Sequence, residues 1–367
     1  MAYLDDLEAL LDGAVPEHPV WTADISYWIA AREADATAEQ AWTTEEGHLK
    51  LCRDLGIMPY YWYERFWLAK EVYDRSVATE TRHHGRTTVT TWTTPVGSIT
   101  AEQTYLASSY STGHSRFPVQ TTQDLEVLLW MVEHRVLEER CLEDYAQRLE
   151  MWARYDGVPA VALRRSPLAS LMYEWSGVVN TSFLIADAPE LMKQLFSLME
   201  GQEQPILDAV CRTRPLLVHF ADNLSSDNMG GYYDEYLAPG HRRRLERLHQ
   251  AGIRCAVHLD GVVHPLLGKL AAIGFDAVEA ITPHPGGDLE IEEVRNAAAH
   301  DGVILWGGVP GILFAPPYTW NDMEAHVRRT VEAWRGTPYI LGVADQVPPD
   351  GDISFCPRIA ELLQEIG

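Results

Sequence analysis

The sequence predicts an α/β fold: a single closed (β/α) barrel with a helical and β-hairpin elaboration in its N-terminal part. From residue 158 onward, short apolar runs alternate with amphipathic helical stretches, which is typical of parallel strands with helices outside them. No G-x-G-x-x-G turn follows any of these runs, which disfavours an open dinucleotide-binding sheet. The length of 367 residues suits one such barrel as well as two smaller domains.

The N-terminal part carries helical patterns separated by loops. Leucines recur at helical spacing within the first eleven residues, and a second helical stretch is expected from residue 37 to Leu55, before Gly56. The aromatic run YYWYERFW at residues 60–67 suggests either core packing or a platform for stacking a ligand, with packing the more common use of such rings.

The next segment changes character. Residues 86–105 are rich in threonine and other β-branched residues on either side of Pro95 and Gly97, which predicts a β-hairpin. After Thr122, apolar residues repeat on one helical face, so a long helical region is expected to end near Gly157.

The barrel pattern occupies the rest of the chain. The expected strands are residues 158–163, 216–221, 253–258, 277–281, 303–306 and 339–343. The expected helices between or after them are residues 189–212, 233–250, 266–273, 291–299 and 322–334. One or two further strands must come from the N-terminal half. We therefore expect a helical extension at residues 1–80, packed on a barrel formed by residues 81–367.

Composition excludes several classes of function. The chain has 29 Lys and Arg against 53 Asp and Glu, a formal net charge of −24, which repels phosphate backbones and anionic lipids, so we expect no nucleic-acid or membrane partner. The five cysteines form no C-x-x-C pair, the N-terminus is acidic, and no apolar run approaches the ~18 residues of a membrane helix. These features favour a reducing cytoplasm.

Candidate functional residues follow the expected strands, because a (β/α) barrel builds its active site at the carboxyl ends of its strands. Asp222 and Asn223 follow one run, and His258 and Asp260 close the next. Residues two apart where a strand ends can point to the same side. His284 and Asp288 follow the fourth run and Asp345 the last, although Asp288 suits a helix cap or loop better. Several carboxylates and imidazoles at one mouth bind a metal or shift each other's protonation, unless they form only a solvated rim.

These strand ends resemble the uroporphyrinogen decarboxylase superfamily. The stretches that carry the resemblance are ADNL at 221–224, LHQAG at 248–252, HLDG at 258–261, GGVP at 307–310 and ADQVP at 344–348, with TTPVG at 93–97 as its N-terminal hairpin. The superfamily includes the haem-pathway decarboxylase and cobamide-linked methyltransferases. The resemblance implies a distorted (β/α)8 barrel. The arginine-rich R-x-A-G-R segment of the decarboxylases is not found near this N-terminus, and the acidic chain suits a polycarboxylate substrate poorly.

The methyltransferase branch of that superfamily holds zinc with an H-x-C pair and a distant cysteine. Here His258 and Asp260 stand at the first two positions and Asp345 near the third, so the resemblance implies a harder ligand set. Such a set favours iron or manganese, or zinc in a role without a thiol ligand. The expected catalytic residues are then Asp222, His284 and His258, of which Asp222 and His284 transfer protons or orient the substrate.

Three hypotheses remain open. The first is a methyltransferase acting on a small organic substrate, in which His258, Asp260 and Asp345 hold a metal or position the substrate and a partner protein supplies a corrinoid. The second is a decarboxylase or other lyase with no metal, in which an Asp at the barrel mouth stabilises a protonated intermediate and Arg164 or Arg165 holds a carboxylate. Asn223, with these two arginines, is an expected substrate-binding residue. The third is a noncatalytic partner of a corrinoid protein, since fold alone does not establish chemistry. A homodimer is considered in each case.

Overall fold

The computed structural model describes residues 3–366 and divides them into two compact units. The first, here called the barrel unit, holds residues 3–67, 143–163 and 213–366; the second holds residues 68–142 and 164–212. Both units are discontinuous in sequence, and the strand β1 (Val20–Thr22) pairs with the last strand of the barrel sheet. The expected division into a helical extension at residues 1–80 and a barrel at residues 81–367 stays a prediction.

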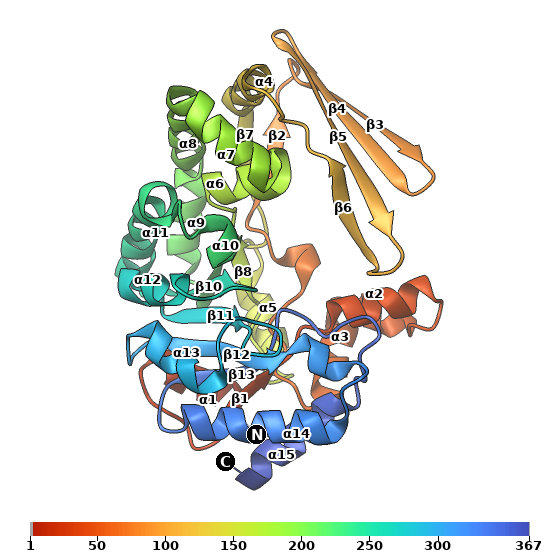
Figure 1. The fold of residues 1–367 in the computed structure, drawn as a ribbon, viewed down its shortest axis with the longest axis vertical. Helices are drawn as coiled ribbons and strands as arrows, with labels where there is room; N and C mark the ends of the chain where they lie inside the picture. The colour runs from red at the N-terminus through yellow and green to blue at the C-terminus, as the bar shows by residue number, and fades with distance from the viewer. Residues whose placement is uncertain (1–2, 367) are drawn as a thin grey trace. The chain divides into compact units, whose positions relative to one another are not determined.

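The barrel unit is built on one parallel sheet, drawn with its outer helices in Figure 1. The strand order is β1-β13-β12-β11-β10-β9-β8. The bounds of the other strands are β8 Val161–Leu163, β9 Leu217–Leu224, β10 Arg254–Leu259, β11 Ala277–Ile281, β12 Ile304–Pro310 and β13 Tyr339–Ala344. All six predicted apolar runs are therefore strands, and their nearly continuous burial is expected of a sheet covered on both faces.

The aromatic run of the N-terminal part closes this sheet into a barrel. The N–H of Met58 donates to the carbonyl of Trp21 in β1, at 2.8 Å. On its other side, the carbonyls of Tyr60 and Phe66 accept hydrogen bonds of 2.8 Å from Ala160 and Ala162, beside and within β8. The segment at 58–67 thus fills the gap between the two edge strands as an irregular eighth stave. The predicted (β/α)8 barrel is confirmed.

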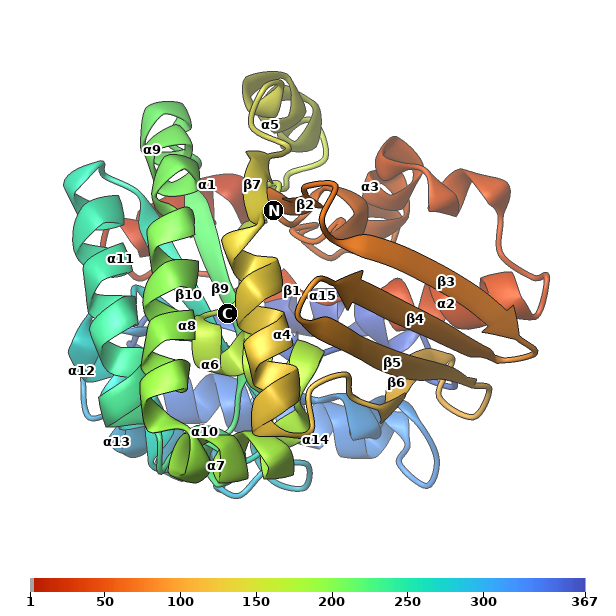
Figure 2. The same ribbon diagram turned by 90° about the horizontal axis from the view of Figure 1, so that it is seen from above.

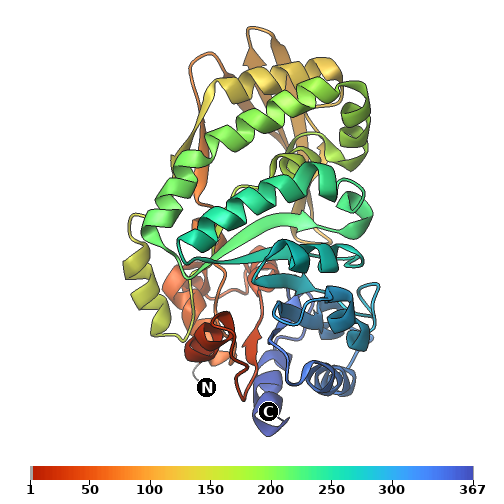
Figure 3. The same cartoon turned by 90° about the vertical axis from the view of Figure 1, so that its left-hand side faces the viewer.

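Helices surround the barrel strands. Figure 3 shows α11 lying along the strands that precede and follow it. The helices of this unit are α1 Tyr3–Leu11, α2 Ser26–Ala34, α3 Glu45–Asp54, α5 Tyr145–Ala153, α10 Ser226–Met229, α11 Ala238–Gln250, α12 Leu266–Ile273, α13 Ile291–Ala298, α14 Trp320–Trp334 and α15 Phe355–Ile366. Helices α1, α11, α12, α13 and α14 correspond to stretches with predicted helical periodicity, and each buries apolar residues. No helix within residues 3–366 is long and apolar enough to cross a membrane.

The second unit combines helices with antiparallel strands. The predicted hairpin is β4 (Thr87–Thr94) and β5 (Gly97–Leu106), and two further strands extend it into a four-stranded sheet, β3-β4-β5-β6. The remaining elements are β2 Ala69–Tyr73, β3 Ala78–His84, β6 Ser111–Arg116, α4 Thr122–Glu133, β7 Arg135–Glu139, α6 Pro167–Ser170, α7 Gly177–Asp187, α8 Pro189–Gln202 and α9 Gln204–Thr213. Figure 2 shows α4 and α8 packed side by side.

The long helical region predicted after Thr122 is wrong in its second half. Helix α4 ends at Glu133, and the chain then forms β7, which pairs with β2 in an antiparallel ladder before α5 begins. Local apolar spacing continues across this break, but the pairing partner lies more than sixty residues earlier in the sequence. Long-range strand pairing has overridden local helical propensity here.

Candidate active site at the barrel mouth

A buried ion pair lies at the carboxyl ends of two neighbouring barrel strands. His258 and Glu279 are paired in register across β10 and β11, and Nδ1 of His258 lies 2.6 Å from Oε2 of Glu279. The Glu279 side chain is 1% exposed and that of His258 13%. Tyr60, on the eighth stave, donates to the other oxygen of Glu279 at 3.3 Å. The carboxylate is therefore held from two sides, which fixes the ring orientation of His258.

The pair sets the protonation of both partners. Burial alone would lower the pKa of His258, but Glu279, together with Asp345 and Asp260, raises it to about 9. Burial conversely favours the neutral form of Glu279, yet its attraction to His258 holds the pKa of that carboxyl below its ordinary value. At neutral pH the two groups form an imidazolium and a carboxylate.

Asp345 follows β13 and interacts electrostatically with His258 and Glu279. Burial, and secondarily the neighbouring carboxylates Asp260, Asp24 and Glu279, raise its pKa to about 6 in spite of the attraction of His258. Asp345 has a φ of +62°, a left-handed conformation that Asp tolerates better than most residues. Its carboxyl group can therefore gain or lose a proton near physiological pH.

Asp24 completes the acidic side of the mouth from the loop after β1. It is 2% exposed, accepts a 2.6 Å hydrogen bond from the hydroxyl of Tyr63 and another of 2.8 Å from the N–H of Ser26. Burial raises the pKa of Asp24, although both hydrogen bonds act to lower it. A carboxyl group in this position belongs to the site, although the sequence did not single it out.

His219 lies deeper in the barrel than His258. It pairs with Ala256 of β10, so it is two residues below the level of His258 on the same inner face. Aromatic rings of Tyr60, Tyr61 and Trp306 surround it at centroid distances of 5.5 to 6.2 Å. Burial lowers its pKa to about 4, so the ring is neutral. Its Nδ1 lies 3.5 Å from the Tyr61 hydroxyl, whereas its buried Nε2 has no hydrogen-bond partner in the described part of the chain.

The local backbone next to Glu279 is irregular. Ala280 has a φ of +66°, and the pairing of β11 with β12 shifts register between Val278 and Ile281. Gly307 of β12 has a φ of +142°, and a Cβ there would lie 2.5 Å from the carbonyl oxygen of Ile281. Such bulges re-aim side chains and are common beside active sites.

The three predicted metal ligands do not form a compact donor set. Among residues 3–366, the group of three or more His, Cys, Asp or Glu residues whose ligand atoms all lie within 4.8 Å of one another is His249, Cys255 and Asp276. His258, Asp260 and Asp345 are near each other electrostatically, but they do not meet that distance. As the side chains lie, the three residues form no compact donor set, and a metal at His258, Asp260 and Asp345 stays a prediction.

The alternative group lies at the opposite ends of the strands. Nε2 of His249, on α11, and the N–H of Cys255 both lie 2.8 Å from the same oxygen of Asp276, and Arg254 lies 3.4 Å from the other. Through these contacts Asp276 links the starts of β10 and β11. The group of His249, Cys255 and Asp276 offers donor atoms for a metal, but the carboxylate of Asp276 already has hydrogen-bond partners within the protein.

Two predicted catalytic residues lie apart from the ion pair. Asp222 is fully buried between the sheet and α11, where one oxygen is 2.8 Å from Nε2 of the buried His241. His284 is exposed in the loop after β11, with its backbone N–H bonded to Leu289. In the same loop Asp288 accepts from two backbone N–H groups, as expected of a loop residue. Catalytic roles for Asp222 and His284 stay predictions.

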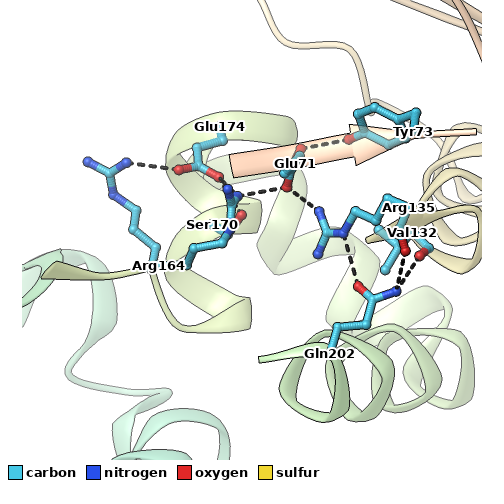
Figure 4. A network of polar contacts seen from close by, with 9 residues as sticks. Glu71, Tyr73, Val132, Arg135, Arg164, Ser170, Glu174 and Gln202 are labelled. Carbon is cyan, nitrogen blue, oxygen red and sulfur yellow. Dashed lines mark hydrogen bonds and ion pairs between the residues drawn. The ribbon is translucent and has the colours of Figure 1, made fainter. Parts of the chain in front are cut away.

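The predicted substrate-binding residues are also dispersed. Asn223 is exposed near the end of β9, with a φ of +50°. Arg164 and Arg165 belong to the second unit, where Arg164 pairs with Glu71 at 2.8 Å and Arg165 with Glu174 at 2.9 Å. Figure 4 shows the network around Glu71, which also includes Arg135, Tyr73 and Gln202. Both arginines therefore already have carboxylate partners.

Sequence reasoning located His258, Asp260 and Asp345 but missed Glu279, His219 and Asp24. Glu279 is the single charged residue in the run AVEAI, and His219 lies within LVHFA. A polar residue in the middle of a buried parallel strand has to face a partner or the barrel interior. Glu279 and His219 both lie inside their runs, so a rule that selects the residues after each run does not include them.

Comparisons with known proteins agree on the fold. No family model matches the chain, and no curated protein matches it in sequence. Among solved structures, a methyltransferase from Methanosarcina mazei is similar over 99% of this chain and 98% of its own length, with a TM-score of 0.61 and 13% identity.

Two further structures are more distant. A B12-independent methionine synthase from Shewanella sp. W3-18-1 covers 72% of this chain, with 74% of its own length aligned, a TM-score of 0.43 and 11% identity. A D-psicose 3-epimerase from Clostridium cellulolyticum H10 covers 60% of this chain, with 81% of its own length aligned, a TM-score of 0.37 and 7% identity. The fold is supported by the similarity to the M. mazei protein alone, which at 13% identity extends to the fold and no further.

Proposed function

We propose that the chain is an enzyme that transfers a methyl group from a small organic substrate, with His258, Glu279 and Asp345 as its acid–base centre. The observation that carries this proposal is the buried 2.6 Å ion pair of His258 and Glu279 at the mouth of the barrel, with Asp345 near it. Glu279 raises the pKa of His258 to about 9, and burial raises that of Asp345 to about 6. The raised pKa keeps His258 protonated at neutral pH, whereas the pKa of Asp345 lies closer to neutral pH than that of an ordinary carboxyl group. The site therefore places a proton donor beside a proton acceptor.

The chemistry follows from these charges. When the methyl group leaves atom X of a substrate R–X–CH3 for an acceptor Nu–H, the bond from carbon to X breaks and the bond from carbon to Nu forms. The carboxylate of Asp345 accepts the proton of Nu–H, and the imidazolium of His258 donates a proton to X. The products are Nu–CH3 and R–XH, and the proton returns from Asp345 to His258 through solvent. Glu279 keeps His258 protonated before the transfer.

The choice of methyl transfer over other reactions rests on similarity to known proteins. The motifs of the uroporphyrinogen decarboxylase superfamily and the full-length structural similarity to the methyltransferase from M. mazei both favour it. Membership of that superfamily, a corrinoid protein as partner, and a homodimer are parts of this proposal. No observation favours the decarboxylase alternative, since Arg164 and Arg165 are paired with carboxylates of their own unit.

The test is a transfer assay on the purified protein. Methylated ammonium, ether and thioether compounds labelled with 13C in the methyl group are incubated with a small thiol, and new methyl resonances are followed by NMR. His258→Gln and Asp345→Asn should each reduce the rate by a factor of about 10² or more, the usual contribution of a general acid or base. Asp301→Asn, which makes the same charge change as Asp345→Asn at an exposed residue before β12, is the control.

Other outcomes would contradict the proposal. Carbon dioxide released from a small carboxylic acid, without methyl transfer, would indicate a lyase. Absence of turnover together with stable capture of a corrinoid protein would indicate a binding protein.

A further inference from the structure

The charges at the barrel mouth are unbalanced. Glu279, Asp345 and Asp260 all act electrostatically on the imidazolium of His258, and Asp24 acts on Asp345. Glu279, at 2.6 Å, already neutralises that cation. The principal charged neighbours of Asp345 are His258 and these carboxylates, with no Lys or Arg among them. The site therefore has an excess of negative charge, which a positively charged ligand would relieve.

Aromatic rings stand beside these carboxylates. Tyr63 is 41% exposed, donates to Asp24 and stacks on Tyr61 at a centroid distance of 5.3 Å. Tyr27 is 39% exposed, and its pKa is raised by burial and by the proximity of Asp345 and Asp24. Tyrosine faces next to carboxylates attract organic cations through the ring quadrupole as well as through charge.

His219 supplies an independent sign of a ligand. Its side chain is 1% exposed and its buried Nε2 has no hydrogen-bond partner in the described residues. A buried polar atom without a partner costs free energy, which a bound water or ligand group recovers. Because His219 is one layer below His258 and is neutral, a hydroxyl or similar uncharged group suits it best.

The spacing of the carboxylates favours an organic ion over a metal. The ligand atoms of His258, Asp260 and Asp345 do not all approach within 4.8 Å of one another, whereas a metal needs ligand atoms at 2.0–2.6 Å from one centre. A bulky cation with diffuse charge can contact carboxylates and rings that are further apart.

We propose that the barrel mouth binds a small organic cation, with its positive charge beside Asp345, Asp24 and Tyr63 and an uncharged polar group hydrogen-bonded to Nε2 of His219. The proposal deepens the proposed function, on which it rests for the identity of the site, by naming the class of substrate. A substituted ammonium compound that carries a hydroxyl group would satisfy both ends of the site, and the amine left after loss of a methyl group can accept the proton of His258.

Calorimetric titration of the full-length protein tests the charge. Choline and 3,3-dimethylbutan-1-ol have the same shape and hydroxyl group, but only choline is charged. Choline should bind at least tenfold more tightly than the alcohol at pH 7.5, and the difference should shrink in Asp345→Asn but not in Asp301→Asn. Equal affinity for the two compounds, or no choline binding at 20 mM, would overturn the proposal.

A second comparison tests His219. Tetramethylammonium has the charge of choline without its hydroxyl group. His219→Phe keeps an aromatic ring and removes Nε2, so it should weaken choline binding several-fold and leave tetramethylammonium binding unchanged. Equal losses for both ligands would show that the variant disturbs the site as a whole and would overturn the assigned hydrogen bond.

A metal arm completes the experiment. Protein treated with a chelator is titrated with Zn²⁺ and Mn²⁺, and tight binding that Asp345→Asn abolishes would overturn the organic-cation proposal in favour of a metal. None of these titrations requires turnover. Choline binding without methyl transfer would contradict the proposed function alone, and methyl transfer from uncharged substrates without choline binding would contradict this inference alone.

Discussion

Replacing Glu279 by Gln should convert His258 from a permanently charged group into a neutral one at physiological pH. In the native protein Glu279 offsets the burial of His258, and its charge and hydrogen bond are the principal reasons that the pKa reaches about 9. The difference from the ordinary histidine value near 6.5 corresponds to roughly 3 kcal/mol of preference for the protonated form. Without the carboxylate, burial dominates, and the pKa should fall to 6.5 or below.

The assay is a titration of the histidine rings by NMR, with the His258 resonance assigned from His258→Gln. The wild-type resonance should titrate near pH 9, and that of Glu279→Gln more than two pH units lower. His219, which is neutral because of burial, should not titrate between pH 6 and 9 in either protein and serves as an internal control. If His258 still titrates near pH 9 in Glu279→Gln, Asp345 and Asp260 hold its charge and our account of the pair is refuted.

The same substitution changes how stability depends on pH. The folded state raises the pKa of His258 above its unfolded value, so the stabilisation is fully present below pH 6.5 and is lost as pH rises through about 9. Urea unfolding of the wild type at pH 6, 8 and 10 should show this loss, whereas Glu279→Gln should lack it. The substitution also removes the cost of burying Glu279, so the slope with pH is the diagnostic quantity rather than the absolute stability.

Three further substitutions have clear expected outcomes. Asp345→Asn should make the protein more stable at pH 8, by about 1–2 kcal/mol after allowance for partial exposure. The folded state raises the pKa of Asp345 to about 6, so ionisation of this carboxyl group destabilises the folded protein as pH rises through that value. Urea unfolding at pH 4 and 8 measures the change. His241→Ala should cost about 3–5 kcal/mol in urea unfolding, since it leaves the buried carboxyl of Asp222 without its imidazole partner, and a loss below 1 kcal/mol would contradict a structural role for the pair. Gly307→Ala should prevent soluble expression or lower the melting temperature sharply, whereas Gly252→Ala, also at positive φ but with open space around it, should have a smaller effect.

The barrel could be predicted because its strands are buried on both faces. Runs such as residues 277–281 and 339–343 are too short and too apolar for surface helices, and the amphipathic stretches between them supply the outer layer. The eighth stave could not be found in the same way. Residues 58–67 contain Pro59 and charged Glu64 and Arg65, and their place between β1 and β8 depends on pairings with segments distant in sequence.

Only some residues of the candidate site could be predicted, because the direction of a side chain also depends on pairings between strands that are distant in sequence. Strand ends point to the mouth of a barrel, so His258 and Asp345 could be selected from the ordering of runs alone. The direction of each side chain depends on strand register, and a change of one residue moves it to the other face. Asp222 shows the effect: it follows the same rule as His258 but faces α11 and bonds His241, whereas His219, three residues earlier, faces the interior.

The placement of these groups also explains why stability and activity should oppose each other at this site. Asp345 and Asp24 are both held with raised pKa values, so the folded protein bears a cost for keeping carboxylates close together and away from water. Packing alone does not require this, since Asn at either position would retain much of the volume without the charge. A bound cation would lower that cost, so it should raise the melting temperature of the wild type and have little effect on Asp345→Asn, whose carboxylate repulsion is already reduced. An equal thermal shift in both proteins would show that the cation binds elsewhere.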